Sequence, residues 1–169
     1  MGKTTDKSAQ SIDTVPNFLA QGHDHEACME DALADAERVC EAAGANLTTL
    51  RKQVLRIVWS GHRPVGAYEI LESLSSGGRR AAPPTVYRAL EFLSEHGLVH
   101  RLASLNAYAG CSNPGHSGHG QFLICTFCGS AVELNDGDIN QVIQQAASRR
   151  GFTPASNTVE IAGTCPNCV

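Results

Sequence analysis

Hydrophobic residues recur at helical spacing in four segments of the first hundred residues, and each segment is followed by glycine. These predicted helices span 29–43, 49–60, 67–75 and 83–96. Thr48 or Thr49 is the expected N-cap of the second helix. Two prolines open the fourth helix and Gly97 follows it, which is typical of a helix entry and a helix exit.

After the fourth helix the pattern changes to short alternating runs. Residues 98–102 and 107–111 lie on either side of the turn-forming sequence 104–106, which predicts a β-hairpin. Helices followed by such a hairpin make a winged helix-turn-helix. Beyond a loop rich in Gly, Ser and His, the pattern predicts strands and one helix, which Asp136 or Asp138 would cap; the strands are 121–125, 131–134 and 157–162, and the helix is 138–150.

These patterns predict an α+β protein made of two small domains. A polar, mobile N-terminal arm is expected over 1–26 and a winged-helix domain over 27–111. A hinge loop over 112–120 would lead to a small α/β domain over 121–169. The chain has 169 residues, of which 42% are hydrophobic, which is enough for cores of this size.

Charge is distributed unevenly along the chain. The formal net charge is −4, but residues 1–50 hold nine acidic and three basic residues, whereas residues 51–101 hold four acidic and eight basic residues. The basic segment includes the fourth helix and the first strand of the hairpin. A nucleic-acid partner is therefore compatible with an acidic protein.

The cysteines and the N-terminus indicate a reducing compartment. The polar N-terminus lacks the apolar segment of an export signal, and no apolar run approaches the roughly 20 residues of a membrane span. We therefore expect a cytoplasmic protein without a membrane partner. The seven cysteines are then expected to be metal ligands or redox groups rather than structural disulfides.

Two Cys-x-x-Cys pairs carry the strongest chemical prediction. A two-residue gap lets both thiolates of a pair reach one tetrahedral ion at about 2.3 Å, and Gly129 permits the turn behind the first pair. Two pairs complete a four-sulfur site, which leaves no position for a substrate. We expect this site to hold a structural zinc ion through four ligands, Cys125, Cys128, Cys165 and Cys168.

A second, looser set of metal donors spans the predicted hinge. Imidazole, thiolate and carboxylate groups occur within about 34 residues, and any four of them could enclose a second zinc ion. The thiolate in this set favours zinc over ferrous iron. The candidates are His100, Cys111, His116, His119 and Glu133.

The fourth predicted helix has the properties of a DNA-reading helix. Its sequence PPTVYRAL places Thr85, Tyr87 and Arg88 on the side opposite the apolar residues. An arginine can pair bidentately with guanine, and a tyrosine can contact a phosphate or a thymine methyl group. Because helices precede it, a hairpin follows it and the segment is basic, we interpret it as the recognition helix.

The order of these features resembles the ferric uptake regulator superfamily, and within it the zinc-sensing branch, the zinc uptake regulators. The motifs that carry the resemblance are PPTVYRAL, LVHRL, Tyr-x-x-Cys ending at Cys111, a His-containing loop, CTFCG, Glu133 and the terminal CPNC, and they cover about 33–168. The resemblance implies a homodimeric bacterial repressor that binds an AT-rich palindromic operator when it is loaded with zinc. The second domain would then be the dimerisation domain.

The resemblance also implies roles for individual residues. Two zinc ions per chain are expected, one structural and one regulatory. The regulatory ligands would be His100, Cys111, His119 and Glu133, with His116 as the alternative loop histidine. The DNA contacts would be Tyr68, Tyr87 and Arg88, together with Thr85, and with Arg51 or Lys52 on phosphates.

Three other functions were weighed against this interpretation. A zinc deaminase needs H-x-E and P-C-x-x-C motifs, which the chain lacks. A thiol oxidoreductase places its Cys-x-x-Cys at the start of a helix, whereas Gly129 and a predicted strand follow here. A sensor of iron, nickel, manganese or peroxide in the same superfamily is the main alternative. We therefore expect no enzyme and no small organic substrate.

Overall fold

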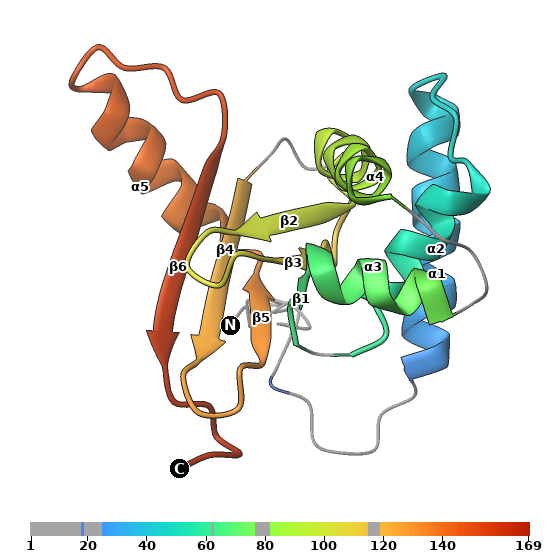
Figure 1. The fold of residues 1–169 in the computed structure, drawn as a ribbon. Coiled ribbons are helices and arrows are strands. Elements are labelled where there is room, and N and C mark those ends of the chain that lie inside the picture. The colour runs from blue at the N-terminus through green and yellow to red at the C-terminus, as the bar shows by residue number, and fades with distance from the viewer. Residues whose placement is uncertain (1–17, 19–24, 62, 77–81, 115–118) are drawn as a thin grey trace, which may run out of the picture.

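The computed structural model describes residue 18 and residues 25–61, 63–76, 82–114 and 119–169. Helices α1–α4 and a small sheet form one half of the molecule, and a second sheet with α5 forms the other (Figure 1). The elements in chain order are α1 (His25–Ala42), α2 (Thr49–Val58), β1 (Val65–Gly66), α3 (Ala67–Ser76), α4 (Pro83–Glu95), β2 (Val99–Leu102), β3 (Ala107–Gly110), β4 (His119–Cys125), β5 (Ala131–Leu134), α5 (Gly137–Ser148) and β6 (Asn157–Gly163).

The first half is a helical bundle closed by a hairpin. Strands β2 and β3 form the predicted antiparallel hairpin, and β1 pairs with the outer side of β3, so the sheet order is β1-β3-β2. Apolar side chains from all four helices and from β2 form one core, which includes Leu33, Ala36, Val54, Leu55, Ile70, Val86, Leu90, Leu93 and Val99. The winged-helix architecture predicted from periodicity is confirmed.

The second half is a mixed sheet in the order β5-β4-β6. Strand β5 is antiparallel to β4, whereas β6 is parallel to it. The parallel pairing places Cys125 opposite Gly163, so the C-terminal ends of β4 and β6 are neighbours. Helix α5 connects β5 to β6, and no described side chain on α5 is buried.

The two halves share a small second core. Leu102 of β2 packs with Phe122 and Ile124 of β4, and all three are buried. The hairpin therefore contacts the helices with one part of its surface and the second sheet with another. Its position in the molecule depends on both halves.

Most predicted boundaries and caps agree with the structure. Thr48 is the N-cap of α2 and accepts a hydrogen bond from Arg51 N, and Asp136 caps α5 by accepting from Asp138 N and Ile139 N. Gly97 follows α4 with φ 64°. These signals are read within a few residues, so the sequence specifies them directly.

Two predicted element starts were wrong, and one strand was missed. Helix α1 begins at His25 instead of Met29, because Glu26 and Ala27 are good helix formers that extend the helix beyond its first apolar residue. Strand β4 begins at His119, inside the predicted loop, because its pairing with β6 starts there. Strand β1 was missed, since two residues carry no periodic pattern.

In the part of the chain that the structure describes, none of the helices combines the length and the apolar character that a membrane span requires.

Candidate metal centres and nucleic-acid interface

The four cysteines of the two Cys-x-x-Cys pairs meet at one end of the second sheet. Cys125 ends β4, and Cys165 and Cys168 follow β6, so the parallel pairing brings both pairs together. Each of the four residues has its sulfur within 4.8 Å of the other three. Cys128 Sγ and Cys165 Sγ are 3.8 Å apart, close to the edge of about 3.8 Å that a tetrahedron with bonds of about 2.3 Å requires.

The turn that carries the first pair needs glycine at position 129. Gly129 has φ 73°, and its N–H donates to Cys125 O at 3.0 Å. A Cβ at this position would also lie 3.2 Å from Nε and Nη2 of Arg63. Arg63 belongs to the connection between α2 and β1, so a cation from the first half lies beside the sulfur cluster.

The sulfur groups compete for protons. Backbone N–H groups of Cys128 and Cys165 lower the pKa of Cys125 to about 6. The neighbouring sulfurs of Cys165 and Cys128 raise the pKa of Cys168 to about 12. Because ionisation of some thiols opposes that of the others, a divalent cation is the group that lets all four ionise together. The donor set therefore fits zinc.

The second donor set joins the hairpin to the second sheet. His100 lies on β2, Cys111 follows β3 and Glu133 lies on β5. All three are buried, and their ligand atoms lie within 4.8 Å of one another. His100 Nε2 is 3.1 Å from Glu133 Oε1, and Cys111 Sγ is 4.0 Å from the same oxygen. The structure thus brings together three predicted ligands that are up to 33 residues apart in the chain.

The two oxygens of Glu133 contact different groups: Oε1 lies near His100 and Cys111, and Oε2 lies near Ser112. Oε2 accepts hydrogen bonds from the backbone N–H and the hydroxyl of Ser112, both at 2.8 Å. Burial raises the pKa of Glu133, but His100 and Ser112 outweigh burial and hold it below its ordinary value. Burial and the charge of Glu133 raise the pKa of Cys111 to about 12. A buried thiol beside a carboxylate ionises readily only with a cation present, so this set also fits a divalent metal.

The loop histidines are placed less completely. His116 lies outside the described residues, and for His119 only the backbone at the start of β4 is described. The next residue, Gly120, lies against His100, because a Cβ there would be 2.9 Å from His100 Nδ1. The backbone of His119 therefore starts the strand that passes the donor set, and its role as a ligand stays a prediction.

The predicted recognition helix α4 exposes the expected side chains. Val86, Ala89 and Leu90 are buried, whereas Thr85, Tyr87 and Arg88 are exposed. Tyr68 at the start of α3 is 71% exposed, which excludes it from the core. The two positions that we expected on phosphates are engaged within the fold.

Arg51 and Lys52 make intramolecular contacts. The Arg51 guanidinium lies over the Phe92 ring, with Cζ 3.4 Å from the ring centre, and Nη1 donates to Asn46 O. Lys52 Nζ is 2.5 Å from Glu37 Oε1. Their predicted phosphate contacts remain predictions.

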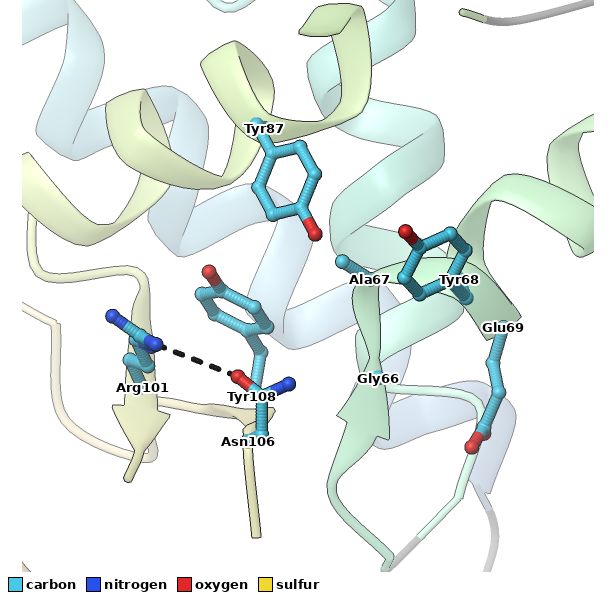
Figure 2. A pocket seen from close by; sticks show the side chains of 8 residues that line it. All are labelled: Gly66, Ala67, Tyr68, Glu69, Tyr87, Arg101, Asn106 and Tyr108. Carbon is cyan, nitrogen blue, oxygen red and sulfur yellow. Dashed lines mark hydrogen bonds between the residues drawn. The ribbon is translucent and has the colours of Figure 1, made fainter. Parts of the chain in front are cut away.

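A hollow of about 370 Å³ lies between α3, α4 and the hairpin. Figure 2 shows Tyr68, Tyr87 and Tyr108 around it, with Arg101 and Asn106 at the hairpin side. Arg101 Nη2 donates to Asn106 Oδ1 at 3.4 Å. The hairpin residues Arg101 and Asn106 were not predicted at this surface. Arg101 is the one exposed residue of β2, whereas Val99, His100 and Leu102 are buried, and this pattern does not follow a simple alternation along the strand.

Comparison with known proteins gives a consistent set of similarities. The sequence profile of the Ferric uptake regulator family matches residues 42–162. The zinc uptake regulation protein of Escherichia coli strain K12 is 35% identical over 143 residues, which cover 83% of this chain and 82% of that protein. The protein of the same description from Mycobacterium tuberculosis strain H37Rv is 31% identical over 130 residues, with 75% and 97% covered.

Two solved structures are also similar. The crystal structure of holo XcZur has 41% identity and a TM-score of 0.76, and the match covers 83% of this chain and 97% of that one. A zinc uptake regulator complexed with zinc and DNA has 33% identity and a TM-score of 0.77, with 83% and 94% covered.

Proposed function

Because this chain belongs to the ferric uptake regulator family, we propose that it represses zinc-uptake genes as a zinc-loaded homodimer bound to operator DNA. Proteins of this family are transcription regulators and not enzymes. The two donor sets would hold one structural and one regulatory zinc ion per chain. Operator DNA places the action of such a repressor in the bacterial cytoplasm.

The observation that carries this proposal is the composition of the second donor set. His100 and Cys111 come from the two sides of the hairpin, and Glu133 comes from the second sheet. Bound zinc would supply a positive charge that compensates the ionised thiol and carboxyl groups of this set. His119 is the proposed fourth ligand. His100 and Glu133 would then hold the hairpin, and with it α3 and α4, in one orientation against the sheet.

The donor types favour zinc over the other metals sensed in this superfamily. A thiolate ligand is softer than imidazole or carboxylate, and it suits zinc better than ferrous iron or manganese. The buried Cys111 supplies that sulfur. The relatives described as zinc uptake regulators support the same choice.

The second half offers a surface for a second copy of the chain. Strand β6 is at the edge of its sheet, and α5 buries no described side chain. Val142, Phe152 and Ile161 are exposed on α5, beyond it and on β6. We propose that these elements form the dimer interface, because an open strand edge beside exposed apolar side chains favours pairing.

In such a dimer two α4 helices would enter successive major grooves about 34 Å apart. Arg88 is the proposed contact to guanine, Tyr87 the contact to a phosphate or a thymine methyl group, and Tyr68 and Thr85 are further proposed DNA contacts. If the winged-helix halves of the dimer are free to reorient, operator affinity falls, because only part of the dimer population has the required spacing between the two α4 helices.

Metal content and operator binding measured together test the proposal. We expect about two zinc ions per chain as isolated and about one after mild chelation. A gel shift on an AT-rich palindrome should disappear with the chelatable ion and return when zinc is added. Cys111→Ser should lose the chelatable zinc and the zinc-dependent shift, whereas Cys28→Ser, which lies outside both donor sets, should keep both.

Two results would contradict the proposal. A zinc-dependent shift of Cys111→Ser equal to that of the wild type would remove the second donor set from regulation. Recovery of the shift with iron or manganese at lower free concentration than zinc would identify a sensor of another metal.

A further inference from the structure

The turn of the hairpin is bound by a carboxylate from the far end of the chain. Glu160 on β6 accepts a hydrogen bond from Ala103 N through Oε1 at 2.7 Å, and from Ser104 N through Oε2 at 3.1 Å. The Ser104 hydroxyl also donates to Oε2. Figure 1 shows the hairpin turn beside β6. The contact spans 57 residues of chain, so only the tertiary structure creates it.

Both oxygens of Glu160 are used, and all three donors belong to the turn. Partial burial raises the pKa of Glu160, but the hydrogen bonds from Ser104 and Ala103 outweigh it and hold the pKa below its ordinary value. The group is therefore a carboxylate near neutral pH. Hydrogen bonds to an ionised acceptor are about twice as strong as neutral ones, so this contact restrains the turn more than a neutral side chain would.

The bound turn is connected to the proposed DNA-binding surface. Arg101 lies on β2, two residues before Ala103 at the start of the turn, and its side chain donates to Asn106 at the end of the turn. Asn106 has φ 48°, which fixes the backbone direction into β3. Arg101 and Asn106 line the hollow opposite Tyr87 of α4 (Figure 2). A shift of the turn would therefore shift one wall of this hollow.

The hairpin is attached to the second half at both ends. At its open end, His100 and Cys111 meet Glu133, and at its turn, Ala103 and Ser104 meet Glu160. Together with the packing of Leu102 against Phe122 and Ile124, these two separated attachments define the orientation of the hairpin.

We propose that Glu160 is a positioning residue, which binds the hairpin turn and so fixes the orientation of the winged-helix half for operator binding. This inference rests on the proposed function. His100, Cys111 and Glu133 would hold a metal ion at the open end of the hairpin, and Glu160 holds the turn, so that the hairpin would keep one orientation rather than several.

The test uses the full-length zinc-loaded protein and the isosteric change Glu160→Gln. An amide can accept from one turn N–H, but its own NH₂ group faces the other donors, so the paired acceptance is lost. Glu41→Gln on α1 is the matched control, because it removes the same charge at an exposed position. Ser104→Ala removes the hydroxyl and leaves both backbone bonds, so it should give a smaller effect in the same direction.

Four measurements are made on each variant. Amide hydrogen exchange at Ala103 and Ser104 without DNA should accelerate about tenfold in Glu160→Gln. Small-angle scattering should show a broader distribution of distances in this variant. The operator dissociation constant should rise about tenfold, although loss of a negative charge by itself favours DNA. Thermal unfolding should show that the variant remains folded.

Each outcome decides the inference. Unchanged exchange in Glu160→Gln would show that the contact does not hold the turn. Faster exchange with unchanged scattering and unchanged operator affinity would show that the contact between Glu160 and the turn does not orient the winged-helix half. If the wild type binds no operator, the proposed function fails, and exchange and scattering still decide whether Glu160 sets the orientation.

Discussion

At the scale of single residues, the second donor set requires a small residue next to His100 as well as the ligands themselves. Gly120 lies where β4 passes His100, and a Cβ there would be 2.7 Å from Phe122 Cε2 and 2.9 Å from His100 Nδ1. Phe122 also contacts the His100 ring edge to face, with ring centres 5.2 Å apart. The imidazole is therefore held between one small and one aromatic residue.

We predict that Gly120→Ala weakens the second metal site and spares the first. The methyl group must displace His100 or Phe122, so zinc affinity at the second site should fall by at least about tenfold. Competition with a chromophoric chelator measures this affinity. Gly137→Ala is the control, because its Cβ meets no atom within 4 Å. Equal zinc affinity in both variants would contradict the tight packing around His100.

At the scale of elements, α4 packs into the core with one face and presents the opposite face to the proposed DNA partner. Its inward positions carry the apolar residues, and its Pro-Pro entry leaves the first turn exposed beside the hollow. Pro83 and Pro84 carry no N–H, and the N–H groups of Thr85 and Val86 donate to Ala82 O, so contacts to DNA at this end would come from side chains. The side chains that read bases are then expected near this end.

We predict that Arg88→Ala weakens operator binding by roughly 1 to 3 kcal/mol and relaxes base preference at one position per half-site. Fluorescence anisotropy on the operator and on single-base variants measures both effects. Arg149→Ala, at the end of α5, removes the same charge away from α4. An Arg88→Ala protein with the wild-type base preference would exclude this residue as a base contact.

At the scale of the whole molecule, α5 and β6 form the proposed dimer interface, which would allow two winged-helix halves to bind one operator together. Val142 on α5 is 61% exposed in the single chain, and Ile161 on the open edge strand is 44% exposed. Exposed apolar groups beside an unpaired strand edge are expected to be covered by the second copy.

We predict that Val142→Glu raises the dimer dissociation constant by about a hundredfold, because it places an unpaired charge in the proposed interface. Sedimentation velocity across a dilution series measures the change. Gln141→Glu, at the neighbouring exposed position, adds the same charge and should dimerise normally. A Val142→Glu dimer as tight as the wild type would place the interface elsewhere.

The family resemblance and the α+β fold were predicted from the sequence and are confirmed. Helix caps at Thr48 and Asp136 and the apolar face of α4 were predictable because their signals lie within one or two turns. The regular spacing of the cysteine pairs likewise identified the first donor set. By contrast, β1 and the start of α1 at His25 were missed, because short or weakly apolar segments carry little periodicity.

By itself the sequence determined the number and approximate positions of the helices and the grouping of four cysteines into two Cys-x-x-Cys motifs, since local periodicity, capping and ligand spacing act over short stretches of chain. Only the tertiary structure decided that β6 runs parallel to β4, that Leu102 joins the second core and that Glu160 reaches the hairpin turn. Such contacts join residues that local spacing does not relate, and they exist only because burial of apolar surface repays the entropy of closing long loops.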